Sequence, residues 1–189
     1  MRLFAAIDLP TEITASLTKV VPADDRMRLV PAAQWHVTLA FYGEVDEPRA
    51  DKLREVLERA ALRSRPFRLR LAGAGTFPKQ AAKARVLWIG LDGEVEELRR
   101  LADRCAGAGR RSRIAMEDRA FRAHLTLGRS RREPVDASHL LAALSSYSSQ
   151  WWNVTTMRLV RSHLGSEVRH ETLDEYELGA ESGKSDNVE

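Results

Sequence analysis

The sequence predicts an α+β fold, and two observations support this class. Segments with the patterns of strands and helices are mixed along the chain, without the strict alternation that a parallel doubly wound sheet requires. Residues 67–71 (FRLRL) alternate between apolar and polar side chains, which is typical of a half-buried strand in an antiparallel sheet. The chain has 189 residues, enough for one substantial core or for two small lobes that share one.

The first half of the chain combines short apolar runs with two helical patterns. Strands are expected over residues 2–7, 27–30 and 35–42, and helices over residues 10–20 and 47–62. Pro10 stands at the first turn of the first helix, where its missing N–H costs nothing. The run over residues 35–42 (WHVTLAFY) is rich in β-branched and aromatic side chains, which favour strands. The helix over residues 47–62 has the spacing of an amphipathic element.

The second half continues the mixed order. Strands are expected over residues 67–71, 85–91, 121–127, 154–160 and 173–178, and helices over residues 95–106 and 137–144. The helix over 95–106 places Leu98, Leu101, Ala102 and Cys105 on one apolar face. Residues 180–189 are polar, and we expect them to form a disordered tail.

Composition limits the possible classes. Hydrophobic residues make up 43% and charged residues 30%, as in ordinary globular proteins. The net charge is +3, and 25 of the 30 basic residues are arginines, whose guanidinium groups match phosphate oxygens. The single cysteine excludes an internal disulfide and a multi-cysteine metal site. With neither a signal peptide nor an 18-residue apolar run, the expected location is the cytoplasm and no membrane partner is expected.

One four-residue pattern occurs twice. His36-Val37-Thr38-Leu39 recurs 88 residues later as His124-Leu125-Thr126-Leu127, close to half the chain length. A single copy would be weak evidence, but two copies at this spacing, each in a strand-like segment, are strong evidence for a duplicated site.

The chemistry of this repeat follows from strand geometry. Side chains at i and i+2 share a face of a strand, so each histidine points the same way as its threonine. Two imidazoles with ordinary pKa values near 6.5 can serve as a general base and a general acid at neutral pH. Threonine hydroxyls can donate hydrogen bonds to phosphate oxygens as their charge grows. This chemistry requires neither a metal nor a cofactor, and we predict none.

The paired motifs resemble those of the 2H phosphoesterase superfamily. Their context is similar to the RNA 2′,3′-cyclic phosphodiesterases, also described as 2′-5′ RNA ligases. The segments that carry this resemblance are residues 2–10, 35–45, 77–78, 85–90, 121–129, 164–165 and 176–178. The similarity spans residues 1–179. It departs from the family pattern at Ala123, where proline is frequent, and at Gly128, where alanine is usual.

The resemblance implies a single bilobal catalytic domain over residues 1–179. Two antiparallel sheets related by a pseudo-twofold axis would line a central cleft, with helices outside. The implied reaction is hydrolysis of a terminal 2′,3′-cyclic phosphate on RNA, or on a small cyclic nucleotide, to a 2′-phosphate, with weak reversible 2′-5′ ligation. By similarity, His36 protonates the leaving 3′ oxygen and His124 activates water, while Thr38, Thr126 and Arg129 contact the phosphate. We expect a monomer.

Two alternatives remain open at the level of sequence. The chain could be an RNA-end binding module with little turnover, or a phosphodiesterase for another small cyclic phosphate.

Residues outside the repeat have plainer interpretations. His139, His163 and His170 are interpreted as surface or structural residues, and Cys105 as a packing residue. The four tryptophans, Trp35, Trp88, Trp151 and Trp152, are expected in the core. Two arginine clusters, Arg110, Arg111 and Arg113 and then Arg129, Arg131 and Arg132, are expected either to face solvent or to contact RNA phosphates.

Overall fold

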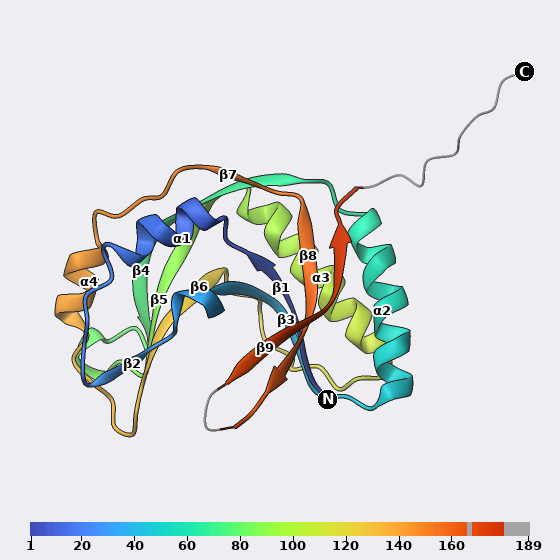
Figure 1. Ribbon diagram of the computed structural model, residues 1–189, viewed down its shortest axis with the longest axis horizontal. Helices are drawn as coiled ribbons and strands as arrows, with labels where there is room; N and C mark the ends of the chain where they lie inside the picture. Colours follow the sequence, from blue (N-terminus) through green and yellow to red (C-terminus); the bar gives the residue numbers. More distant parts are fainter. Residues whose placement is uncertain (166–167, 180–189) are drawn as a thin grey trace, which may run out of the picture.

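The computed structural model describes residues 1–165 and 168–179 and contains two antiparallel sheets (Figure 1). The four-stranded sheet has the order β3-β1-β8-β9, and the five-stranded sheet has the order β2-β6-β5-β4-β7. Every strand pairing in both sheets is antiparallel. The predicted α+β class is therefore confirmed.

The strands of the four-stranded sheet come from both ends of the chain. They are β1 (Arg2–Asp8), β3 (His36–Glu44), β8 (Thr156–His163) and β9 (Arg169–Glu177). The five-stranded sheet contains β2 (Met27–Leu29), β4 (Phe67–Phe77), β5 (Val86–Gly93), β6 (His124–Ser130) and β7 (Trp152–Val154). The chain therefore crosses between the sheets after β1, after β2, after β3 and after β7.

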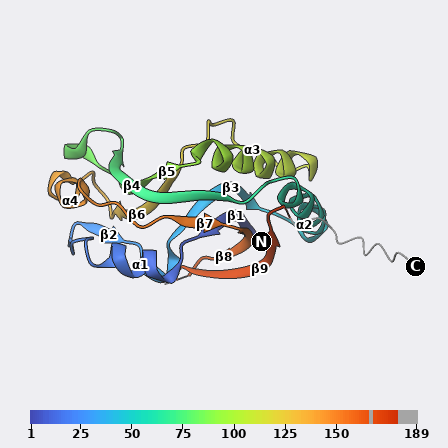
Figure 2. The same ribbon diagram turned by 90° about the horizontal axis from the view of Figure 1, so that it is seen from above.

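Within the described residues there are four α-helices and two short 3-10 turns. They are α1 (Thr11–Thr18), α2 (Glu47–Leu62), α3 (Val95–Arg111), α4 (Ser138–Leu144), η1 (Ala32–Gln34) and η2 (Ala81–Lys83). α2 begins where the Asp46 side chain accepts a hydrogen bond from the backbone N–H of Arg49 at 3.0 Å, an N-cap that satisfies one free helix donor. α2 and α3 contact each other and lie by the four-stranded sheet, whereas α1 and α4 lie toward the other end of the molecule, by the five-stranded sheet (Figure 2).

Several predicted boundaries differ from the structure; for example, α3 continues beyond residue 106 to Arg111, and β9 begins at Arg169 instead of residue 173. The single strand expected over residues 154–160 is divided at Thr155, because β7 pairs with β4 in one sheet and β8 pairs with β1 in the other. β4 continues beyond residue 71 to Phe77, since Gly73 adopts a φ of 75° at a bulge instead of ending the strand. β6 begins at His124, not at residue 121. The tail predicted over residues 180–189 lies outside the described residues.

The two faces of β1 belong to different apolar clusters. Leu3, Ala5 and Ile7 join the main core, which includes Cys105, confirming the packing role expected for this thiol. Phe4 and Ala6 point the other way and form a small second cluster with Val160. Of the four tryptophans, Trp35 and Trp152 are buried as predicted, but Trp151 is 41% exposed and stacks against Arg68 and Arg70. In the described part of the chain, no helix is long and apolar enough to cross a membrane.

Candidate active site

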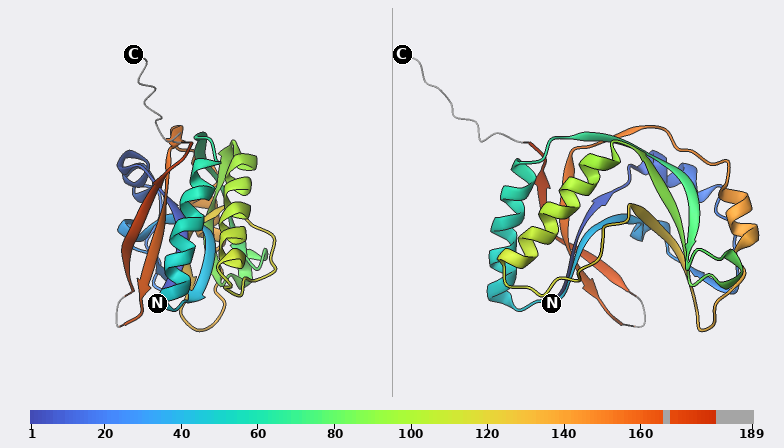
Figure 3. Two further views of the ribbon diagram at one scale, coloured as in Figure 1. Left: turned by 90° about the vertical axis from the view of Figure 1, so that its right-hand side faces the viewer. Right: turned by 180° about the vertical axis from the view of Figure 1, so that it is seen from behind.

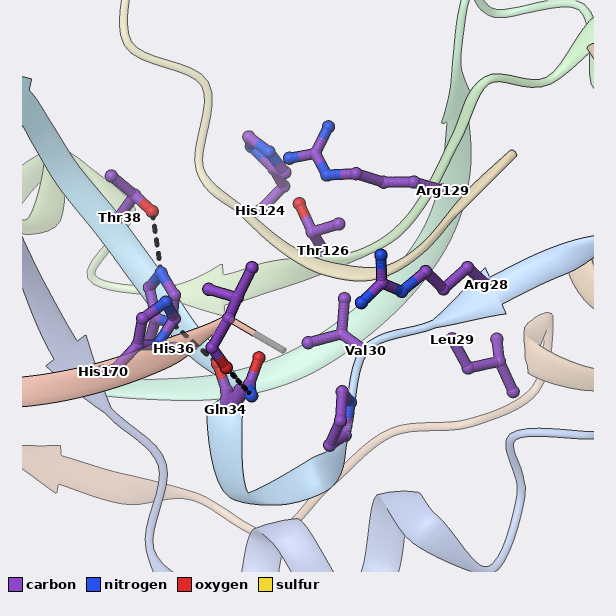
Figure 4. A pocket seen from close by; sticks show the side chains of 12 residues that line it. Arg28, Leu29, Val30, Gln34, His36, Thr38, His124, Thr126, Arg129 and His170 are labelled. Carbon is purple, nitrogen blue, oxygen red and sulfur yellow. Dashed lines mark hydrogen bonds between the residues drawn. The ribbon is translucent and has the colours of Figure 1, made fainter. Parts of the chain in front are cut away.

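A cavity of about 450 Å³ contains all five residues that the sequence predicted for the site, and residues of both sheets line it (Figure 4). Its lining residues are Arg28, Leu29, Val30, Pro31, Gln34, His36, Thr38, His124, Thr126, Arg129, Val168 and His170. β3 and β6, which carry the two motifs, contact each other although they belong to different sheets. The fold therefore brings the two copies of the repeat to one cavity.

His36 is the first residue of β3, and two hydrogen bonds fix its ring. Its Nδ1 lies 2.8 Å from the backbone oxygen of Gln34, and its Nε2 lies 3.1 Å from the Thr38 hydroxyl (Figure 4). Because a carbonyl can only accept, Nδ1 must carry the proton of the neutral ring, and Nε2 then accepts from Thr38. Burial lowers the pKa of His36 to about 4, and the positive charges of His170 and Arg158 contribute, against the opposing effect of the Gln34 carbonyl.

An aromatic layer supports His36 from the second apolar cluster. The Phe4 ring stacks on the imidazole, with centroids 4.8 Å apart and an interplanar angle of 27°. His170 from β9 meets both rings edge-on, 5.3 Å from His36 and 5.1 Å from Phe4. These contacts restrict rotation of the imidazole and keep Nε2 directed to the Thr38 side of the ring.

His124 is held in the same way at the start of β6. Its Nδ1 donates to the backbone oxygen of Arg122 at 2.7 Å, again the carbonyl two residues earlier. Its ring packs edge-on against Phe77 at 5.2 Å and Trp88 at 6.4 Å. Burial is the main cause that lowers the pKa of His124, and the charges of Arg129 and Arg122 add to it.

The two threonines differ in their hydrogen bonds. Thr38 is engaged with His36, whereas Thr126 Oγ1 has no hydrogen-bond partner within residues 1–165 and 168–179. The Thr126 hydroxyl is thus available for a ligand in the cavity.

A β-bulge at the same motif position in each strand shapes the site. In β3, Ala5 pairs with Ala40 and Ala6 with Thr38, so Leu39 is the extra residue. In β6, Leu87 pairs with Gly128 and Trp88 with Thr126, which leaves Leu127 as the extra residue. Strict alternation would direct Arg129 away from Thr126. The bulge shifts the phase by one residue and places Arg129 on the cavity side.

The structure also explains the glycine at position 128, where the resemblance expects alanine. A Cβ at this position would lie 2.8 Å from Met27 Cγ and 3.1 Å from Leu29 Cδ2. The side chains of β2 occupy the space that an alanine methyl group would need.

Seven cavity residues were not predicted from the sequence, and three of them have polar side chains. His170 was interpreted as surface or structural, but it lines the cavity, and burial lowers its pKa. Arg28 lies beside Arg129 as its cross-strand partner in β2. Gln34 donates from Nε2 to the backbone oxygen of Val168 at 2.7 Å and so links η1 to the segment before β9. None of these residues belongs to a repeat or a periodic pattern, so no signal in the single sequence marks them.

The other two histidines outside the repeat lie as predicted. His139 pairs with Asp24 at 3.0 Å and His163 with Glu171 at 2.7 Å, both away from the cavity.

Two fixed imidazoles, two threonine hydroxyls and two arginines around one cavity form a site suited to a phosphate ester. The imidazoles provide proton transfer, and the guanidinium and hydroxyl groups provide donors for phosphate oxygens. The fold and the site together define the class of two-histidine phosphoesterases.

Comparisons with known proteins agree with this class. Residues 7–88 match the model of the family described as LigT like Phosphoesterase. The RNA 2′,3′-cyclic phosphodiesterase of Thermus thermophilus is 34% identical over 200 residues, covering 97% of this chain and 93% of the relative. The protein of the same name from Archaeoglobus fulgidus is 32% identical over 167 residues, covering 87% and 92%. The chain belongs to the LigT-like phosphoesterase family.

Solved structures show the same architecture. The crystal structure of a protein from Thermus thermophilus aligns with a TM-score of 0.76 at 30% identity, covering 95% of this chain and 98% of the other. Escherichia coli LigT complexed with 3′-AMP aligns with a TM-score of 0.76 at 28% identity, covering 94% and 97%.

Proposed function

We propose that this protein is an RNA 2′,3′-cyclic phosphodiesterase that hydrolyses a terminal cyclic phosphate to a 2′-phosphate. The observation that carries the proposal is the pair of imidazoles, each fixed through Nδ1 by the carbonyl two residues earlier, that line one cavity with Thr38 and Thr126. The names of the relatives support the substrate class.

In the proposed reaction, water attacks phosphorus and the bond to the 3′ oxygen breaks. His124 takes the proton from water, and His36 gives a proton to the leaving 3′ oxygen. Arg129 and the free Thr126 hydroxyl donate to the non-bridging oxygens, which gain charge as the water oxygen adds. The same ring opening with a ribose 5′ hydroxyl in place of water forms a 2′-5′ linkage and frees the 3′ hydroxyl, which accounts for the weak ligation that the family resemblance implies.

The lowered pKa values set a condition on this mechanism. Both histidines favour the neutral state in the free protein, because burial penalises the imidazolium ion. An anionic phosphate diester in the cavity favours the protonated state of a nearby imidazole. His36 therefore takes up its proton when the substrate binds.

The test is hydrolysis of 2′,3′-cyclic AMP and of an oligonucleotide with a cyclic phosphate end, measured in EDTA. We expect His36→Ala and His124→Ala each to lose at least about a thousandfold in kcat, since proton transfer and its geometry are both removed. His139→Ala, outside the cavity, is the matched control and should keep full activity. Full activity in either cavity variant would contradict the acid–base pair.

Product analysis separates the remaining candidates. Salt-sensitive binding of the oligonucleotide without any phosphomonoester product would favour an RNA-end binding module. Hydrolysis of 2′,3′-cyclic AMP but not of the oligonucleotide would favour a phosphodiesterase for small cyclic phosphates. The cytoplasmic location and the monomeric state expected from the sequence stay predictions.

A further inference from the structure

A second cavity lies in the helical layer, apart from the active site. It has a volume of about 380 Å³ and is lined by Val56, Arg59, Ala60, Arg63, Arg104 and Arg111. These residues come from α2, its C-terminal cap and α3, which run side by side in Figure 3. We call this cavity the arginine groove. It shares no lining residue with the catalytic cavity.

Within the part of the chain that the structure describes, the four arginines of the groove have no carboxylate partner, unlike four other arginines of the same two helices. Arg49, Arg54, Arg99 and Arg100 each lie within 4.0 Å of an aspartate or glutamate oxygen. Across residues 1–165 and 168–179, no carboxylate oxygen lies that close to any of the four groove arginines. Glu55, one turn before Arg59, is instead paired with Lys52 at 2.8 Å. Within the described residues, the four like charges of the groove therefore form no ion pair, and Glu55 acts on Arg59 only from a longer distance.

A contact inside the protein orients one of these guanidinium groups. Arg104 is half-buried, and its Nη1 donates to the Ser64 hydroxyl at 3.1 Å. Ser64 is itself buried and donates to the backbone oxygen of Ala60 at 2.8 Å. The side chains of Arg59, Arg63 and Arg111 are exposed to solvent. The groove thus has one guanidinium group held from inside the protein and three that face solvent, while Val56 and Ala60 supply its apolar part.

We propose that the arginine groove is a binding site for a small polyphosphate anion, such as a di- or triphosphate chain. Guanidinium groups bind phosphate oxygens in a bidentate manner, and several of them around one cavity suit an anion with several adjacent phosphates. The volume falls within the range of about 300 to 1,000 Å³ that is usual for small-molecule sites. The chain can be free polyphosphate or the tail of a nucleotide, because only the phosphates meet the arginines.

The experiment is isothermal titration of the full-length protein with inorganic tripolyphosphate, and in parallel with ATP and AMP. Arg59→Gln/Arg111→Gln removes one groove arginine from each helix. Arg110→Gln/Arg113→Gln removes the same charge from arginines that do not line the groove and is the matched control. We expect at least a tenfold loss of tripolyphosphate affinity in the groove variant and less than a threefold loss in the control.

Further measurements complete the test. Hydrolysis of 2′,3′-cyclic AMP should stay within twofold of wild type in both variants. The melting temperature without ligand should not fall in the groove variant, because removing two positive charges relieves the repulsion among the groove arginines. Equal loss of affinity in the two double variants would overturn the proposal, as would loss only in Arg129→Gln, which would place the anion in the catalytic cavity. If ATP binds as tightly as tripolyphosphate and AMP binds at least tenfold more weakly, the ligand can be the phosphate tail of a nucleotide. If tripolyphosphate alone binds, the ligand is free polyphosphate.

Discussion

Replacing His36 by glutamine should change how the stability of this protein depends on pH. The pKa of His36 in the folded protein is about 4, because the ring is buried, against an ordinary value of 6.5. The unfolded chain therefore binds a proton at this position more tightly than the folded chain does. The folded state keeps its full stability above pH 6.5 and loses part of it as the pH falls toward 4.

The size of this effect follows from the shift in pKa. One pKa unit corresponds to about 1.4 kcal/mol, so full protonation of His36 would cost at most about 3 to 4 kcal/mol of the free energy of unfolding. At pH 5 the expected cost is about 2 kcal/mol. Glutamine does not titrate and should remove this contribution.

The assay is urea unfolding of wild type and His36→Gln at pH 7 and pH 5. Other groups also titrate in this interval, so the informative quantity is the difference between the two proteins. Wild type should lose about 2 kcal/mol more than the variant between these pH values. His139→Gln, an exposed position beside Asp24, is the control for removing an imidazole. Equal losses in wild type and His36→Gln would refute the proposed effect of burial on this ring.

Three further outcomes are expected. Thr126→Val should lower kcat about a hundredfold with little change in KM, because the hydroxyl donates mainly as charge grows on phosphate, and Thr126→Ser should keep most of the activity in the same steady-state assay. In a pH–rate profile, kcat/KM should fall about tenfold per pH unit above the lowered pKa of His124, because both imidazoles of the free protein are then neutral. The fall in kcat should begin at a higher pH, because the bound substrate keeps the proton on His36. Coincident pH profiles of kcat and kcat/KM would contradict proton uptake with the substrate. Gly128→Ala should lower the free energy of unfolding by about 1 to 3 kcal/mol in urea denaturation, because the new methyl group meets Met27, and unchanged stability would show that β2 can move.

The duplicated motif made the central pair of the site predictable. Strand periodicity alone indicated that His36 and Thr38 point the same way, and the spacing of the two copies suggested that they meet. The same periodicity fails at Arg129, which faces the cavity only because of the bulge at Leu127. Arg129 was predicted instead from the family resemblance, which does not assume that side chains alternate regularly along the strand.

The remaining site residues depend on tertiary pairing that one sequence does not encode in a local pattern. His170 reaches His36 because β9 is paired with β8, which in turn is paired with β1. The passage from one sheet to the other at Thr155 is equally invisible, since the apolar run continues through it. Trp151 is exposed because it covers the polar face of the five-stranded sheet, where Arg68 and Arg70 lie over its ring.

The repeated passage of the chain between the sheets means that neither half of the molecule is a contiguous stretch of sequence. The four-stranded sheet takes its strands from residues 2–8, 36–44, 156–163 and 169–177, and the five-stranded sheet takes the intervening segments. A cut between any two consecutive strands would separate β1 from β9 and so divide the strands of the four-stranded sheet between two fragments. We therefore expect limited proteolysis to yield no half that survives on its own, and gene fragments encoding one half to give unfolded polypeptide.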